Sequence, residues 1–115
     1  MFPGKKYETI CGENIVPRVE IHPEAQTEVN ATIAWYENEW IGLGMEFLDE
    51  VDRSILLISE APDIWRNYGE IPCVRRLNIH RFPYHIVYRQ RNSIIQIIAI
   101  SHHHQKPGYW KHRLQ

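Results

Sequence analysis

Residues 73–101 read CVRRLNIHRFPYHIVYRQRNSIIQIIAIS, and their pattern predicts three consecutive β-strands. The first, over 73–79, alternates apolar and polar side chains, as a half-buried strand does. The second, over 84–91, is rich in aromatic and β-branched residues, and Arg91-Asn92-Ser93 after it suits a hairpin turn. The third, over 94–101, is the most apolar of the three, so we expect a central strand there.

A short strand and two helices are predicted before these strands. The strand covers 18–22, and behind it apolar residues recur at helical spacing over 23–40. Gly42 and Gly44 allow a tight reversal, after which a second apolar stripe predicts a helix over 44–60. Two helices joined by so short a loop should pack antiparallel as a helical hairpin.

The predicted order is therefore β-α-α-β-β-β, an α+β fold in which the helical hairpin packs on one face of an antiparallel sheet. A chain of 115 residues has room for one domain, which we place at 18–115, after a loosely held arm at 1–17. Helix and strand periodicity predict a core made of Val19, Ile21, Val29, Ile33, Tyr36, Trp40, Phe47, Leu48, Val51, Ile55, Ile58, Leu77, Ile79, Ile86 or Val87, Ile95, Ile97 and Ala99.

The charges of this chain are divided between its two halves. The formal net charge is only −1, but all 14 carboxylates lie between Glu8 and Glu70. The first 70 residues hold five Lys or Arg against those 14 carboxylates, and the last 45 hold eight Lys or Arg and no carboxylate. An excess of one sign favours an anionic partner for the C-terminal half. The alternative is that the acidic half neutralises the basic half inside one domain.

Composition argues against several classes of protein. The longest apolar runs have four residues, far from the roughly 20 that a membrane span needs. No apolar stretch follows the basic N-terminus, so we expect no signal peptide, no membrane partner and a cytoplasmic location. Cys11 and Cys73 are too few for a disulfide scaffold, and we expect Cys73 to be a small buried strand residue.

The basic strands are the first candidate for function. Guanidinium groups bind phosphates or carboxylates, and tyrosine or histidine rings can stack on bases. The mixture suits single-stranded RNA or an acidic protein segment, although strand-surface arginines and core tyrosines would give the same pattern. The residues concerned are Arg75, Arg76, Arg81, Arg89 and Arg91, with Tyr84, Tyr88, His80 and His85 among them.

Three consecutive histidines, His102 to His104, are the second candidate. Neighbours in an extended chain point to opposite sides, so the run lacks the converging ligands of a zinc site, and we expect no metal and no cofactor. A single histidine acting as acid or base fits better. If the domain is an enzyme, RNA cleavage by 2′-OH attack suits it, because the substrate supplies the nucleophile and cations stabilise the transition state.

Several segments of the sequence, together with the predicted order of elements, are typical of one family. They are Gly42-Leu43-Gly44-Met45-Glu46-Phe47, Val74-Arg75-Arg76-Leu77, Arg81-Phe82-Pro83-Tyr84-His85-Ile86-Val87-Tyr88, and Ala99 to His102 followed by Lys106-Pro107-Gly108-Tyr109-Trp110-Lys111-His112-Arg113. With these segments the chain resembles the RelE/ParE superfamily of bacterial toxins. The resemblance covers about residues 18 to 114. The family often has arginine where this chain has Lys106, which keeps the charge but not the bidentate fork.

The resemblance implies a small toxin that a cognate antitoxin holds inactive, the antitoxin being an acidic or amphipathic chain laid over the hairpin and the sheet. One branch of the superfamily inhibits DNA gyrase, and the other cuts mRNA on the ribosome without a metal. The tail favours the gyrase-directed branch, and the Arg and His content favours the ribonuclease. We predict a ParE-like inhibitor of gyrase, with the ribonuclease and an inactive antitoxin-binding relative as alternatives. In a ribonuclease the catalytic residues would be Arg81, Tyr84 and His102, and in either branch the binding residues would be Arg75, Arg76, Arg89, Lys106, Tyr109, Trp110 and Arg113.

Overall fold

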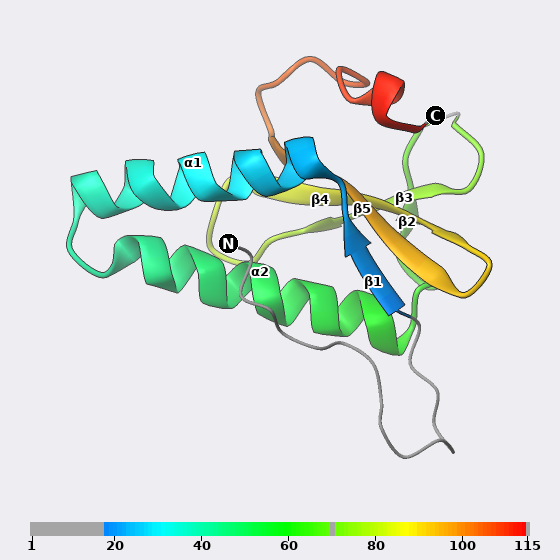
Figure 1. Cartoon of the computed structure of the whole chain (residues 1–115), viewed down its shortest axis with the longest axis horizontal. Helices are drawn as coiled ribbons and strands as arrows, with labels where there is room; N and C mark the ends of the chain where they lie inside the picture. The colour runs from blue at the N-terminus through cyan, green and yellow to red at the C-terminus, as the bar shows by residue number, and fades with distance from the viewer. Residues whose placement is uncertain (1–17, 70, 115) are drawn as a thin grey trace.

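The structure is a computed structural model that describes residues 18–69 and 71–114. The predicted α+β order is confirmed, with one short strand added before the three C-terminal strands (Figure 1). The predicted arm at 1–17 lies outside the described residues. The elements are β1 (Arg18–Ile21), α1 (Pro23–Glu39), α2 (Leu43–Glu60), β2 (Arg66–Asn67), β3 (Val74–Asn78), β4 (Tyr84–Arg91), β5 (Ile94–His102) and a 3-10 helix, η1 (Lys111–Leu114).

The five strands form one sheet in the order β1-β5-β4-β3-β2. β5 has a strand on both sides, in keeping with its apolar sequence. The pairs β3–β4 and β4–β5 are antiparallel, as predicted, and the added strand β2 also pairs antiparallel with β3. The departure is β1, which pairs parallel to β5 and makes the sheet mixed rather than wholly antiparallel. Periodicity within a strand says which side chains are buried but not which way its neighbour runs.

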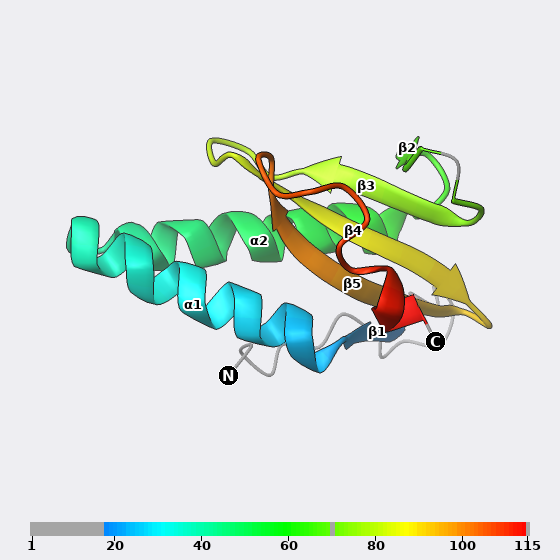
Figure 2. The ribbon, with the colours of Figure 1, turned by 90° about the horizontal axis from the view of Figure 1, so that it is seen from above.

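The helical hairpin is held at both ends by side chains that bind backbone N–H groups. At the start of α1 the His22 Nδ1 accepts a hydrogen bond from the Glu24 N–H at 3.1 Å. At the turn, Gly42 has φ +89°, which favours glycine, and the two carboxylate oxygens of Glu37 accept from the Gly42 and Gly44 N–H groups at 2.8 and 3.0 Å. The two helices lie side by side on one face of the sheet (Figures 1 and 2).

At Gly44 the backbone of α2 lies close against α1. A Cβ built on Gly44 would lie 2.5 Å from the carbonyl oxygen of Ile33 on α1. No other residue type fits there without moving one helix away from the other.

The main core lies between the hairpin and the sheet and confirms the predicted one, apart from Trp40 and from Ala99, which is buried on the opposite face of the sheet. Val29, Phe47, Val51, Ile55 and Ile58 are completely buried. Trp40 is wrongly predicted, because its side chain is 73% exposed. The reason is local: Trp40 ends α1 in an extended conformation (φ −160°, ψ 128°), which takes its side chain off the helical stripe.

A second apolar cluster lies on the opposite face of the sheet, where residues 103–114, the C-terminal segment or tail, cross the strands (Figure 2). At the bulge opposite Val87 and Tyr88, Ile98 is an extra residue of β5, so Ile98 and Ala99 both join the second cluster while Ile97 and Ile100 belong to the main core. The described chain therefore has three layers, namely the hairpin, the sheet and the C-terminal segment. The members of the second cluster are Val74, Val87, Ile98, Ala99 and Trp110, with Tyr68, Ile71, Tyr109 and Leu114 packed against them.

Cys73 corrects another expectation. It is exposed, and its φ of +65° places it in a turn just before β3, not inside the strand. Among the described residues no helix is both long and apolar enough to cross a membrane.

Candidate functional site

The predicted catalytic residues gather near one end of the sheet, where the β3–β4 turn and the end of β5 lie. Arg81 is in the turn with φ +75° and forms an ion pair with Glu46 of α2 at 2.8 Å. That hydrogen bond raises the pKa of Arg81. The guanidinium also lies over the Phe82 ring, 5.4 Å from its centroid. Arg81 is half-exposed but already has an anionic partner inside the protein.

Tyr84 and His102 face each other across the β4–β5 pair. They are register partners, and their ring centroids are 4.9 Å apart at nearly perpendicular planes. The His102 Nδ1 accepts a hydrogen bond from the His104 N–H at 3.0 Å, so a neutral ring carries its proton on Nε2. Burial, followed by the charges of His104 and His103, lowers the pKa of His102. The pair can therefore offer a neutral imidazole beside a phenol.

Hydrogen bonds to Glu28 hold the C-terminal segment and the end of β5 against α1. One oxygen of Glu28 accepts from the Ile100 N–H and from Arg113, each at 3.0 Å, and the other accepts from Arg113 at 2.9 Å and from the Tyr109 hydroxyl at 2.6 Å. Arg113 also donates to the Ile98 carbonyl at 3.1 Å. Burial lowers the pKa of Arg113, but the hydrogen bond and charge of Glu28 outweigh it and raise that pKa overall.

The C-terminal segment carries three of the predicted binding residues. Trp110 is completely buried between this segment and the sheet, and Arg113 is only 7% exposed. Tyr109 is half-buried, and burial together with Glu28 raises the pKa of its hydroxyl. Trp110 and Arg113 therefore hold the tail in place and, in this conformation, present no surface to a partner.

Two other predicted cations are also used within the fold. Arg75 donates to the Trp65 carbonyl at 2.8 Å. Arg89 donates to the Gln96 side chain at 2.7 Å and to the Leu114 carbonyl at 2.8 Å. Burial is the main cause that lowers the pKa of Arg89, and Arg91 adds to it.

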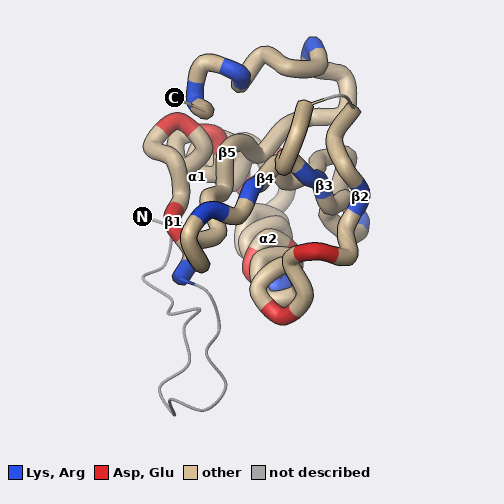
Figure 3. Tube along the Cα trace, turned by 90° about the vertical axis from the view of Figure 1, so that its right-hand side faces the viewer, with Lys and Arg blue, Asp and Glu red and all other residues tan. Residues whose placement is uncertain are grey.

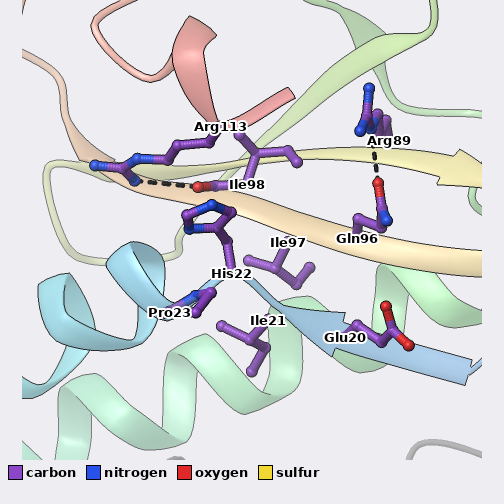
Figure 4. Close-up of a pocket in the computed structure, with 9 residues that line it drawn as sticks. All are labelled: Glu20, Ile21, His22, Pro23, Arg89, Gln96, Ile97, Ile98 and Arg113. Carbon is purple, nitrogen blue, oxygen red and sulfur yellow. Dashed lines mark hydrogen bonds between the residues drawn. The ribbon is translucent and has the colours of Figure 1, made fainter. Parts of the chain in front are cut away.

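Arg89 also lines a polar cavity of about 210 Å³ between the sheet and the tail. Figure 4 shows Arg89 and Gln96 at one side of this cavity, with Arg113 and His22 at the other. Arg113 and His22 are already hydrogen-bonded within the fold.

Arg66 and Arg76 are two cations that have no carboxylate partner among the described residues. They line two adjoining hollows of about 230 and 210 Å³ near β2 and β3, and neither hollow has a carboxylate in its lining. Arg76 lies over the Tyr68 ring, 5.7 Å from the centroid, and has no ion pair within the described chain. Lys106 is exposed in the loop after β5. Figure 3 shows Lys and Arg along β3, β4 and the tail.

His85 is a residue that the sequence analysis named only as part of the basic strands, and it has the most unusual environment among them. It is 4% exposed, and neither ring nitrogen has a hydrogen-bond partner in the described structure. Its ring stacks on His103 at 5.3 Å and lies 6.0 Å from Tyr68. Burial, followed by the charges of Arg76 and His103, lowers its pKa to about 4. His85 is neutral at pH 7.

The strand register divides the predicted site between two faces. Arg75 and Tyr88 pair on the side that packs on the hairpin, as do Tyr84 and His102. Arg76 and Arg89 alternate with them and point to the tail side. Arg81, Tyr84 and His102 therefore lie at one end of the sheet, away from Arg89 and Arg113. The described residues hold no group of three or more His, Cys, Asp or Glu placed to bind a metal ion.

Comparisons with known proteins agree with this architecture. The model of the family "ParE toxin of type II toxin-antitoxin system, parDE" matches residues 19–107. A chain of the chromosomal ParDE system from P. aeruginosa has a similar structure, with TM-score 0.64, 20% identity, and coverage of 73% of this chain and 92% of that one. A mutant of E. coli toxin RelE in the free state gives TM-score 0.61 and 13% identity, covering 78% of this chain and 86% of that one.

A search of curated proteins finds no match. The structural likenesses show a shared fold, and the family model goes further because it matches most of the sequence. The chain belongs to the ParE toxin family of type II toxin–antitoxin systems.

Proposed function

We propose that this chain arrests growth by binding and inhibiting DNA gyrase, has no ribonuclease activity, and is neutralised by a cognate antitoxin. Cleavage of RNA by 2′-OH attack needs several uncommitted cations around one phosphate. The main support for the proposal is that Arg113 has a structural role. It is buried and forms an ion pair with Glu28, so it is not free to bind a phosphate. Arg81 is likewise paired with Glu46, and Arg89 is bound to a side-chain amide and a backbone carbonyl.

A specific observation favours the ribonuclease alternative. Arg66 and Arg76 lack a carboxylate partner in the described chain, and Trp65 and Tyr68 beside them offer aromatic faces. An RNA strand could use such a surface for phosphate contacts and base stacking. The same two arginines suit an acidic antitoxin equally well. Antitoxin binding should weaken when salt is raised or when Arg66 and Arg76 are replaced by alanine, and insensitivity to both would contradict the electrostatic contact.

The two alternatives differ in what they require of a proton-transferring residue. We expect Arg81→Ala to relieve growth arrest, because it breaks the ion pair that holds the β3–β4 turn against α2. We expect His102→Gln to leave growth arrest unchanged, because a binding inhibitor moves no proton. A ribonuclease that used His102 as base would lose roughly 10²–10⁴-fold in rate in the His102→Gln variant. Circular dichroism would check that both variants fold. Relief by both substitutions would support chemistry, and relief by neither would show that the site is elsewhere.

A further inference from the structure

The free end of the helical hairpin carries a cluster of large apolar side chains exposed to solvent. Trp35 is 58% exposed, Trp40 73%, Ile41 90% and Met45 55%. Figure 2 shows this end of α1 and α2 extending beyond the edge of the sheet. Single exposed apolar residues are ordinary, but four large ones within residues 35–45, at the end of α1, in the turn and at the start of α2, indicate an interaction surface. We call Trp35, Trp40, Ile41 and Met45 the hairpin tip.

The backbone that carries the tip is fixed before any partner arrives. Glu37 binds the N–H groups of Gly42 and Gly44, and the Trp40 N–H donates to the Tyr36 carbonyl at 3.0 Å. The Leu43 N–H donates to the Trp40 carbonyl at 3.0 Å, which closes the turn. A surface held rigid in this way loses little conformational entropy on binding. Tryptophan is also among the residues that contribute most to protein interfaces.

The charge around the tip defines the partner. Between Pro23 and Asp52 the sequence has eight carboxylates and no lysine or arginine. Glu24 and Glu28 lie at the far end of α1, and Glu46 is paired with Arg81, so the carboxylates that count at the tip are those without such a partner. Glu39 and Asp49 are exposed. A segment that is apolar and basic complements such a surface, whereas an acidic segment is repelled.

From the exposure, rigidity and charge of the tip we infer that it is the surface that grips the toxin's protein target, through an apolar segment of gyrase that carries lysine or arginine. This inference rests on the proposed function. The protein then has two binding surfaces of opposite charge. The cations of β2 and β3 bind an acidic antitoxin, and the hairpin tip, with carboxylates near it, binds the target.

The test uses purified full-length variants in a gyrase supercoiling assay. We expect the double variant Trp40→Ser with Ile41→Ser to need about tenfold more protein for half-inhibition, as for loss of a central interface contact. The matched control is Leu56→Ser with Ile64→Ser, two apolar residues that are 47% and 69% exposed away from the tip, and it should inhibit like the unmodified chain. Unchanged melting temperatures would show that both variants fold.

A second pair of variants isolates the charge. Glu39 and Glu60 are exposed and are the last residues of α1 and α2, where a lysine favours the helix dipole. Glu39→Lys should weaken inhibition about tenfold by repelling a basic segment, while Glu60→Lys should not. If the tip variants inhibit as well as their controls, the inference is wrong and the proposed function stands. If the unmodified chain leaves gyrase active, the proposed function and the inference both fail.

Discussion

Glu28 is the residue that joins the C-terminal segment to the rest of the protein. Its two oxygens accept four hydrogen bonds, from Ile100, Tyr109 and Arg113. Without Glu28 the nearly buried guanidinium of Arg113 would keep only the Ile98 carbonyl and the longer contact to Glu24 at 3.4 Å.

We therefore expect Glu28→Ala to lower the free energy of unfolding by about 3 kcal/mol, the cost of leaving a buried charge unpaired. Glu20→Ala is the control, because its carboxylate contacts exposed Arg18 at 3.8 Å and should matter by less than about 0.5 kcal/mol. Urea denaturation measures both. Equal losses in the two variants would mean that the tail is held by its apolar contacts alone.

His85 gives the stability a dependence on pH. Its pKa is about 4 in the folded chain and about 6.5 in the unfolded chain, so the unfolded state takes up the proton first as pH falls. Stability should thus decline from pH 6.5 to pH 4, by up to about 1.4 kcal/mol for each pH unit, and this contribution should level off below pH 4.

The variant His85→Phe should remove that part of the pH dependence. Both ring nitrogens of His85 lack partners, so an apolar ring of similar shape loses no hydrogen bond and keeps the contact with Tyr68 and His103. Melting temperatures from pH 7 to pH 4 measure the effect for both proteins. If the two curves stay parallel, His85 is not the group that titrates.

The helix α2 supplies four completely buried side chains to the main core, whereas α1 supplies two. Ile55 is completely buried and its neighbour Leu56 is 47% exposed. We expect Ile55→Ala to cost about 2–5 kcal/mol in unfolding free energy, because it leaves a cavity under the hairpin. Leu56→Ala should cost far less. An unchanged denaturation midpoint for Ile55→Ala would contradict the packing of the hairpin on the sheet.

Elements with a local signal were predictable from sequence, and those set by distant contacts were not. The predicted helix at 23–40 is observed at Pro23–Glu39, and the predicted strand at 84–91 is β4. The parallel pairing of β1 and the two-residue strand β2 depend on partners far along the chain. Trp110 and Arg113 read as surface residues because the segment 103–114 has no periodicity, yet Glu28, 85 residues from Arg113, buries the arginine.

On the scale of the whole molecule, the charge division seen in the sequence is only partly cancelled by folding. Glu46 forms an ion pair with Arg81, and Glu28 forms one with Arg113, so the acidic half neutralises part of the basic half. Arg66 and Arg76 near β2 and β3 have no carboxylate partner in the described chain, and Glu39 and Asp49 near the hairpin tip are exposed. The molecule therefore presents two surfaces of opposite sign, which suits a toxin that must meet both an antitoxin and a target.

The proposed toxin acts by binding gyrase and does not cut RNA. The most direct test adds the purified chain to a gyrase supercoiling reaction and, in parallel, to ribosomes translating a defined mRNA whose ends are then mapped. We expect loss of supercoiling, recovery of supercoiling when antitoxin is added, and an mRNA that keeps its original ends. New mRNA ends at ribosome-bound codons, together with undiminished supercoiling, would contradict it.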